Sequence, residues 1–259
     1  MSNLYLSGVT GHYASTPDSV ALSISGNIDV RVKVALTDWT PSAAQYLIGK
    51  YNVTGNQRSY ALRVNSAGTL SLLNSTDGTG VSTFNSSVAT DVTDGATKWL
   101  RVTVTATGYV IKFWTSDDGA TWAQLGTSVN QGGTATTYDG SAPLELGSYG
   151  GGTTGIAGNF YRAQIRDNVL NDDTGIVFDA DFTAQSDNIN AFAEASSNHA
   201  TVTIYGRSLG YEPTWLPAEA LCGNANHYGY EAKKLDAPEP APKTTYPAAT
   251  GGTTYPTQR

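Results

Sequence analysis

Cysteine, methionine and histidine are scarce in this chain of 259 residues, which has one Cys, one Met and three His. Because Cys222 stands alone, the chain has no internal disulfide and no zinc site built from several thiolates. Only 14% of the residues are charged, and the net charge of -7 leaves no basic surplus for phosphates, so we expect no nucleic-acid partner. No apolar run approaches the length of a membrane span, so we expect no membrane insertion.

Glycine is abundant, with 28 residues, and apolar residues alternate with polar ones in several segments. In the clearest, IDVRVKVAL at 28–36, the alternation predicts a strand with one buried face and one face in water, the latter carrying Asp29, Arg31 and Lys33. Similar alternation occurs at 59–64, 69–73, 99–105, 109–114, 160–166, 177–182 and 201–205. Asp-Gly pairs at 77–78, 94–95, 118–119 and 139–140 predict tight turns with positive φ. This pattern predicts an all-β sandwich or barrel of antiparallel sheets.

The composition changes after Tyr205, because seven of the ten prolines lie at 206–259. We therefore predict a β domain at 1–205 and an extended, largely irregular arm, rich in proline and tyrosine, at 206–259. Aromatic side chains on an extended segment are suited to grooves on a partner protein. The predicted anchoring residues of the arm are Tyr211, Trp215, Tyr228, Tyr230, Tyr246 and Tyr255.

Three sequence patterns bear on catalysis. The segment TSDDGATW at 115–122 fits the Asp box of sialidases, but it occurs once, and we interpret it as a hairpin turn on which Trp122 folds back. The segment GRSLG at 206–210 fits the nucleophile elbow, yet Pro213 and Pro217 break the helix that must follow it. The run E-x-D-x-x-E of sandwich glucanases is missing, and Glu145 and Glu194 stand alone. We predict no catalytic residues and no enzyme activity.

Two sets of residues are candidates for ligand binding. Asp179 and Asp181 share one face of a predicted strand and would form half of a calcium site, with a solvated strand face as the favoured alternative. A carbohydrate site needs aromatic platforms and a few polar donors at a loop rim. The candidates in loop-like segments are Tyr51, Asn56, Gln57, Arg58 and Tyr149, with ordinary protein surface as the alternative. No cofactor other than calcium is expected.

The order of several blocks resembles that of a known family: LIGKYNVTGNQRSYALRVNSAGTLSLLNSTDG, KWLRVTV, FWTSDDGATWAQLG, LELGSYGGGTTGIAGNFYRAQIRD and VFDADFTA. The chain resembles the laminin G-like, concanavalin A-like jelly-roll domains in virion proteins of phages that infect actinobacteria, over about residues 4–205. The resemblance implies a two-sheet jelly roll and a place on a phage particle, as a minor tail or capsid-surface protein. Related domains bind calcium and glycans at a loop rim, but their ligand residues cannot be assigned to positions of this sequence.

We therefore expect a non-enzymatic virion surface protein, either a head decoration or a minor tail component. Its lectin-like domain would be displayed outward, its arm would hold it to capsid or tail subunits, and it would be a homo-oligomer in the assembly. The N-terminus, MSNLYLSGVTGHYAS, lacks the features of a signal peptide, which agrees with assembly in the host cytoplasm and release by lysis. The alternatives are an adhesin that binds host-envelope glycans and a glycosidase.

Overall fold

The computed structural model describes residues 2–206, and their regular structure consists of sixteen β-strands and three short 3-10 turns. The turns are η1 (Val20–Leu22), η2 (Thr54–Asn56) and η3 (Phe182–Ala184). The strands form two eight-stranded sheets in which every pairing is antiparallel. The predicted all-β fold with two antiparallel sheets is therefore confirmed.

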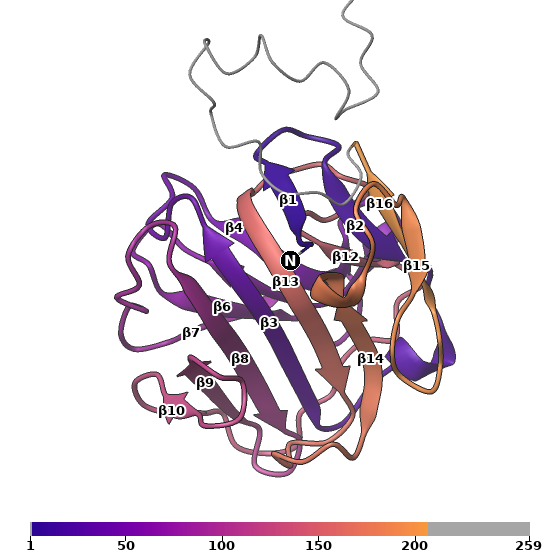
Figure 1. Cartoon of the computed structure of the whole chain (residues 1–259). Coiled ribbons are helices and arrows are strands. Elements are labelled where there is room, and N and C mark those ends of the chain that lie inside the picture. The colour runs from indigo at the N-terminus through magenta and orange to yellow at the C-terminus, as the bar shows by residue number, and fades with distance from the viewer. Residues whose placement is uncertain (1, 207–259) are drawn as a thin grey trace, which may run out of the picture. The chain divides into compact units, whose positions relative to one another are not determined.

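The first sheet, here called the β3 sheet, faces the viewer in Figure 1. Its main order is β1 (Leu4–Ser7), β13 (Ala157–Arg166), β3 (Ile28–Leu36), β8 (Thr97–Thr105), β9 (Val110–Ser116) and β10 (Ala123–Gln124), with β14 (Ile176–Asp181) paired to β13 and β11 (Val129–Asn130) to β9. The second, the β4 sheet, has the order β15 (Ala191–Ala193), β16 (Thr201–Tyr205), β2 (Tyr13–Thr16), β12 (Leu144–Leu146), β4 (Gln45–Asn52), β5 (Gln57–Val64), β6 (Leu70–Asn74) and β7 (Ser82–Asn85). Several neighbouring strands, such as β1 and β13 or β2 and β16, are distant in sequence, as in a jelly roll.

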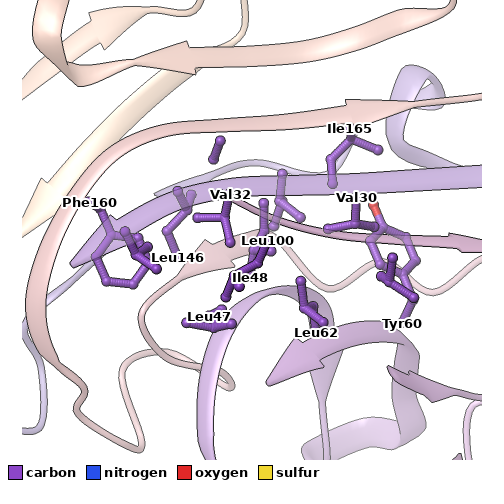
Figure 2. Packing of buried hydrophobic residues seen from close by; sticks show 14 of the residues in the cluster. Val30, Val32, Leu47, Ile48, Tyr60, Leu62, Leu100, Leu146, Phe160 and Ile165 are labelled. Atoms are coloured by element: carbon purple, nitrogen blue, oxygen red, sulfur yellow. The ribbon is translucent and has the colours of Figure 1, made fainter. Parts of the chain in front are cut away.

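One apolar core fills the space between the two sheets (Figure 2). Alternate residues of β3, such as Val30 and Val32, meet residues of the facing sheet, such as Leu62, and all three are fully buried. Because successive side chains of a strand point to opposite faces, the other residues of each strand lie on the outer faces of the sandwich. Those two outer faces carry polar and aromatic side chains.

The strongest alternation in the sequence predicted strands best. The strands predicted at 28–36 and 201–205 match β3 and β16 at both ends, and positive φ values at Gly78, Gly95 and Gly119 confirm three of the predicted turns. The fourth is wrong, because Gly140 is not in the positive-φ region; instead its N–H donates to Ser59 Oγ. The prediction that the polar face of β3 is in water is also wrong for Asp29 and Arg31, which are 0% and 3% exposed.

Within residues 2–206, no helix has the length and apolar character needed to cross a membrane. The six aromatic residues predicted as anchors, and the GRSLG segment beyond Gly206, lie outside the described residues. The boundary between the β domain and the arm therefore stays a prediction, although β16 ends at Tyr205.

Candidate ligand-binding faces

Five tyrosines gather on the outer face of the β4 sheet, on both sides of the glycine-rich loop 147–155. We call them the tyrosine strip: Tyr13, Tyr46, Tyr51, Tyr149 and Tyr205. On one side, Tyr13 and Tyr205 face each other across β2 and β16 and stack with centroids 4.5 Å apart and planes inclined by 7°. On the other side, Tyr149 of the loop packs on Tyr46 at 4.4 Å and edge-on to Tyr51 at 5.7 Å. Tyr205 is 42% exposed, so the stacked pair offers an open aromatic edge.

A buried carboxylate holds the glycine loop in place. Glu145 points outward from β12, and its two oxygens accept hydrogen bonds from the N–H groups of Gly151 (2.7 Å) and Gly152 (3.2 Å). Burial raises the pKa of the Glu145 carboxyl, and these two N–H donors oppose the rise. Gly152 has a φ of +82°, and a Cβ there would lie 2.7 Å from the Tyr13 ring, so only glycine lets the loop lie this close to the stacked pair.

The predicted carbohydrate residues separate into two groups. Tyr51 and Tyr149 come together in the tyrosine strip, but Tyr51 lies in β4 and is buried, so its predicted loop position is wrong. Asn56 lies in η2, whereas Gln57 and Arg58 are the first two residues of β5, so the predicted loop position is wrong for these two as well. All three side chains tie loops together. Arg58 Nη1 donates to Asn56 Oδ1 (3.3 Å) and to the carbonyls of residues 78 and 79 (both 3.0 Å), while Gln57 Oε1 accepts from the N–H of residue 141 at 2.6 Å. Each of these three side chains has at least one polar atom engaged within the protein.

The outer face of the β3 sheet carries a buried ionic cluster. Arg31 and Arg101 face each other across β3 and β8, and both donate through Nε and Nη2 to Asp29, with the shortest contacts at 2.7 and 2.8 Å. Arg166 of β13 lies across from Asp29 in the strand register and is also buried. Three buried guanidinium groups therefore lie around one buried carboxylate, which accepts hydrogen bonds from two of them.

The predicted hairpin turn covers this cluster. Asp118 Oδ1 accepts from the N–H groups of Ala120 (2.8 Å) and Thr121 (2.7 Å), and these bonds lower the pKa of Asp118. The chain then returns along β10 against β9, and the Trp122 ring lies 5.3 Å from the guanidinium carbons of both Arg31 and Arg101. The structural interpretation of the single Asp box is confirmed, since its turn places a tryptophan over two arginines.

Asp179 and Asp181, the predicted calcium ligands, contact a cation of the protein itself. Arg162 donates through Nε and Nη2 to the two oxygens of Asp179, at 2.7 and 2.5 Å, and its Nη1 lies 3.9 Å from Asp181. Asp179 is 5% exposed, so the alternative of a solvated strand face is wrong for this residue. Across residues 2–206 no three His, Cys, Asp or Glu side chains gather as metal ligands would, and calcium binding stays a prediction.

The sequence patterns missed the arginine cluster, Glu145 as a loop anchor, and the Tyr13–Tyr205 pair. Each depends on a register between strands that are far apart in the chain, such as β2 with β16. A signal did exist, because Arg31, Arg101 and Arg166 each sit at polar positions of alternating strands. Only the strand order shows that these positions are adjacent.

Burial of tyrosine hydroxyls makes an alkaline titration informative. Burial raises the pKa of Tyr46 from 10.0 to about 12. Because the folded pKa exceeds the unfolded one, the stability that this group contributes is complete below about pH 10 and is lost as the pH rises towards 12. We expect phenolate absorbance at 295 nm to show a class of tyrosines that titrates late, and this class should be reduced in Tyr46→Phe. A single transition near pH 10 for all tyrosines would contradict this.

Comparison with solved structures agrees with a jelly roll. A heptameric SAP-like pentraxin from Limulus polyphemus matches with a TM-score of 0.50 and 13% identity over 78% of this chain and 94% of that chain. The CBM40 domain of the Ruminococcus gnavus IT-sialidase, bound to α2,3-sialyllactose, matches with a TM-score of 0.46 and 16% identity, over 63% and 91% of the two chains. Domains LG4-5 of the mouse laminin α1 chain match with a TM-score of 0.43 and 16% identity, over 75% and 50%. Neither a family model nor a curated protein sequence matches. The fold is thus a two-sheet jelly roll shared with the pentraxin.

Proposed function

We propose that this chain is a non-enzymatic glycan-binding module that binds sugars on the tyrosine strip. The observation that carries the proposal is the exposed Tyr13–Tyr205 stack beside the glycine loop. Sugar rings present apolar C–H faces that pack on aromatic rings, and their hydroxyls need nearby polar partners. Thr203 lies two residues before Tyr205 on the same face of β16, and the backbone of loop 147–155 lies beside Tyr13 at Gly152.

A binding role fits the acidic residues better than a catalytic one. Hydrolysis needs two carboxylates free to act on either side of a glycosidic bond. Glu145 instead holds the glycine loop, and Glu194 accepts hydrogen bonds from the N–H groups of residues 179, 196 and 200. Both side chains are buried, so their oxygens are engaged in positioning loops.

The experiment is a glycan array followed by titration of the glycan that binds most tightly. We expect Tyr205→Ala and Tyr13→Ala each to weaken binding by about tenfold or more, as for aromatic residues at the centre of an interface. The matched control is Tyr161→Ala, which removes a tyrosine from the outer face of the β3 sheet. Equal losses in all three variants would contradict a site on the tyrosine strip, and so would the absence of any bound glycan with and without calcium.

We further propose that the module is displayed on a phage particle, as a head decoration or minor tail component, with segment 206–259 as its anchor to capsid or tail subunits. The order of sequence blocks and the proline- and tyrosine-rich composition of that segment support this proposal. Deleting 206–259 should leave the domain soluble but remove it from purified particles. Unchanged incorporation of the shortened chain would contradict the anchoring role.

A further inference from the structure

The ionic cluster on the outer face of the β3 sheet has more positive than negative charge. Arg31, Arg101 and Arg166 are 3%, 4% and 3% exposed, and Asp29 is the one buried carboxylate among them in the described residues. Asp29 is engaged by the first two arginines, which also approach the carbonyls of residues 170 (3.5 Å) and 169 (3.3 Å). A buried charge without a partner is costly, so the third guanidinium is the unusual feature of this face.

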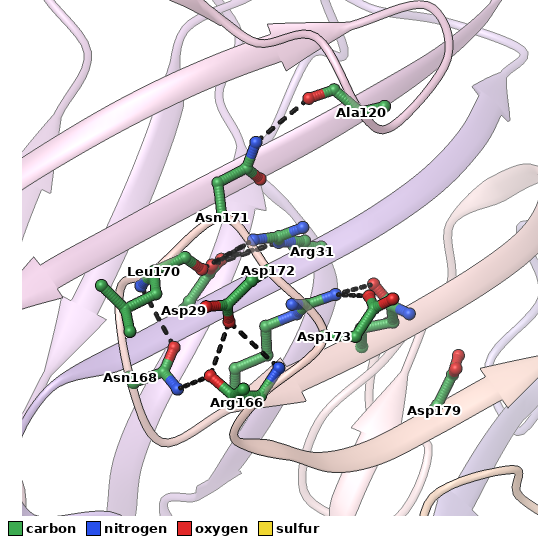
Figure 3. Close-up of polar contacts among 12 residues, drawn as sticks. Asp29, Arg31, Ala120, Arg166, Asn168, Leu170, Asn171, Asp172, Asp173 and Asp179 are labelled. Carbon is green, nitrogen blue, oxygen red and sulfur yellow. Dashed lines mark hydrogen bonds and ion pairs between the residues drawn. The ribbon is translucent and has the colours of Figure 1, made fainter.

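Arg166 is only partly satisfied (Figure 3). Its Nη2 lies 3.5 Å from Asp173 Oδ1 and 3.4 Å from Gln164 Oε1, while Nε and Nη1 are buried without a hydrogen-bond partner. Asp173 is 98% exposed, so this ion pair is screened by water and contributes little. The Arg166 guanidinium therefore has unused N–H donors. The Asp173 carboxylate beside it is surrounded by water, so a competing anion can displace it.

The cover over the cluster consists of two segments joined to each other. Loop 167–175 supplies Asp173 and the carbonyls above Arg31 and Arg101, and the hairpin turn at 115–122 supplies Trp122. Asn171 Nδ2 donates to the carbonyl of residue 120 at 3.1 Å and links the two segments, as Figure 3 shows. This link holds the loop near the arginines without using a donor of Arg166.

We propose that Arg166 is the centre of an oxyanion-binding site, which takes a carboxylate, sulfate or phosphate group of a ligand in the position that Asp173 otherwise occupies. Guanidinium groups bind such oxyanions through paired N–H donors. Arg31 and Arg101, on the same face of the β3 sheet, add positive electrostatic potential. The site lies on the opposite sheet from the tyrosine strip, so it goes beyond the proposed function and does not depend on it.

The test is calorimetric titration of the full chain with sodium sulfate, inorganic phosphate and glucuronate, at constant ionic strength set with chloride. Asp173→Asn removes the competing carboxylate from a fully exposed position, so it should fold normally and bind the best of these anions about two- to fivefold more tightly than the wild type. Asp187→Asn, an exposed charge-matched control, should bind like the wild type. Preference for glucuronate would indicate a sugar carboxylate, and preference for the inorganic anions a sulfate or phosphate ester.

A second pair of variants tests the arginine itself. Arg166→Gln should weaken anion binding by about tenfold or more, whereas Lys112→Gln, which removes a partly exposed cation from the same sheet face, should change it by less than about twofold. If Arg166→Gln does not fold, the Asp173→Asn and Asp187→Asn pair decides alone. The proposal is overturned if none of the three anions binds saturably to the wild type or Asp173→Asn, or if Asp173→Asn binds no more tightly than Asp187→Asn, or if a folded Arg166→Gln binds like the wild type.

Discussion

Replacing Asp29 with Ala should destabilise the domain by about 3–5 kcal/mol, because it removes the shared counter-ion of two buried guanidinium groups. Arg31 and Arg101 both donate two-pronged hydrogen bonds to this carboxylate, which is fully buried. In the variant their charges would be left without a carboxylate under Trp122 and loop 167–175. Urea unfolding followed by tryptophan fluorescence measures the loss.

Asp117→Ala is the control for that substitution. Asp117 also pairs with a cation, Lys98, but it is 85% exposed on the hairpin turn, so its removal should cost less than about 1 kcal/mol. If Asp29→Ala lowered the free energy of unfolding as little as Asp117→Ala does, the buried cluster would not contribute to the stability of the β3 sheet.

Phe160→Ala should destabilise the fold by a similar amount, about 3–5 kcal/mol, since it opens a cavity between the sheets. Phe160 lies in β13, is fully buried, and points into the core in Figure 2. Val88→Ala, at a side chain that is 47% exposed, should change the free energy of unfolding by no more than about 0.5 kcal/mol. A small loss at Phe160 would mean that the two sheets are not held together by the core described above.

The sequence predicted the architecture because β3 and parts of the other long strands alternate apolar and polar residues. Apolar and polar residues alternate strictly over residues 28–34 of the segment predicted at 28–36, and the structure begins and ends β3 at the predicted positions. β4 was not predicted, since Leu47 and Ile48 are adjacent core residues and the register shifts between 46 and 48, which breaks the period of two. Strands of three or four residues, such as β12 and β15, are too short to show a period at all.

The candidate sites were harder to predict, because they form across the sheets. The sequence singled out Tyr51 and Tyr149 as aromatic candidates, but it did not single out their neighbour Tyr46 or the separate Tyr13–Tyr205 pair. Alternation of apolar and polar residues also predicts a solvent-exposed outer face, whereas Asp29 and Arg31 are covered by a loop from another part of the chain. A sequence pattern reports which face a residue occupies, but not what later segment folds over that face.

The most direct test of the central claim is an NMR titration of the isotope-labelled full chain with an uncharged glycan selected on the array. If the tyrosine strip binds the sugar, amide shifts should concentrate at Tyr13, Tyr205 and loop 147–155, and the glycan should remain intact. Shifts confined to the outer face of the β3 sheet, or new reducing-end signals from a cleaved glycan, would contradict a passive binding module that uses the β4 sheet.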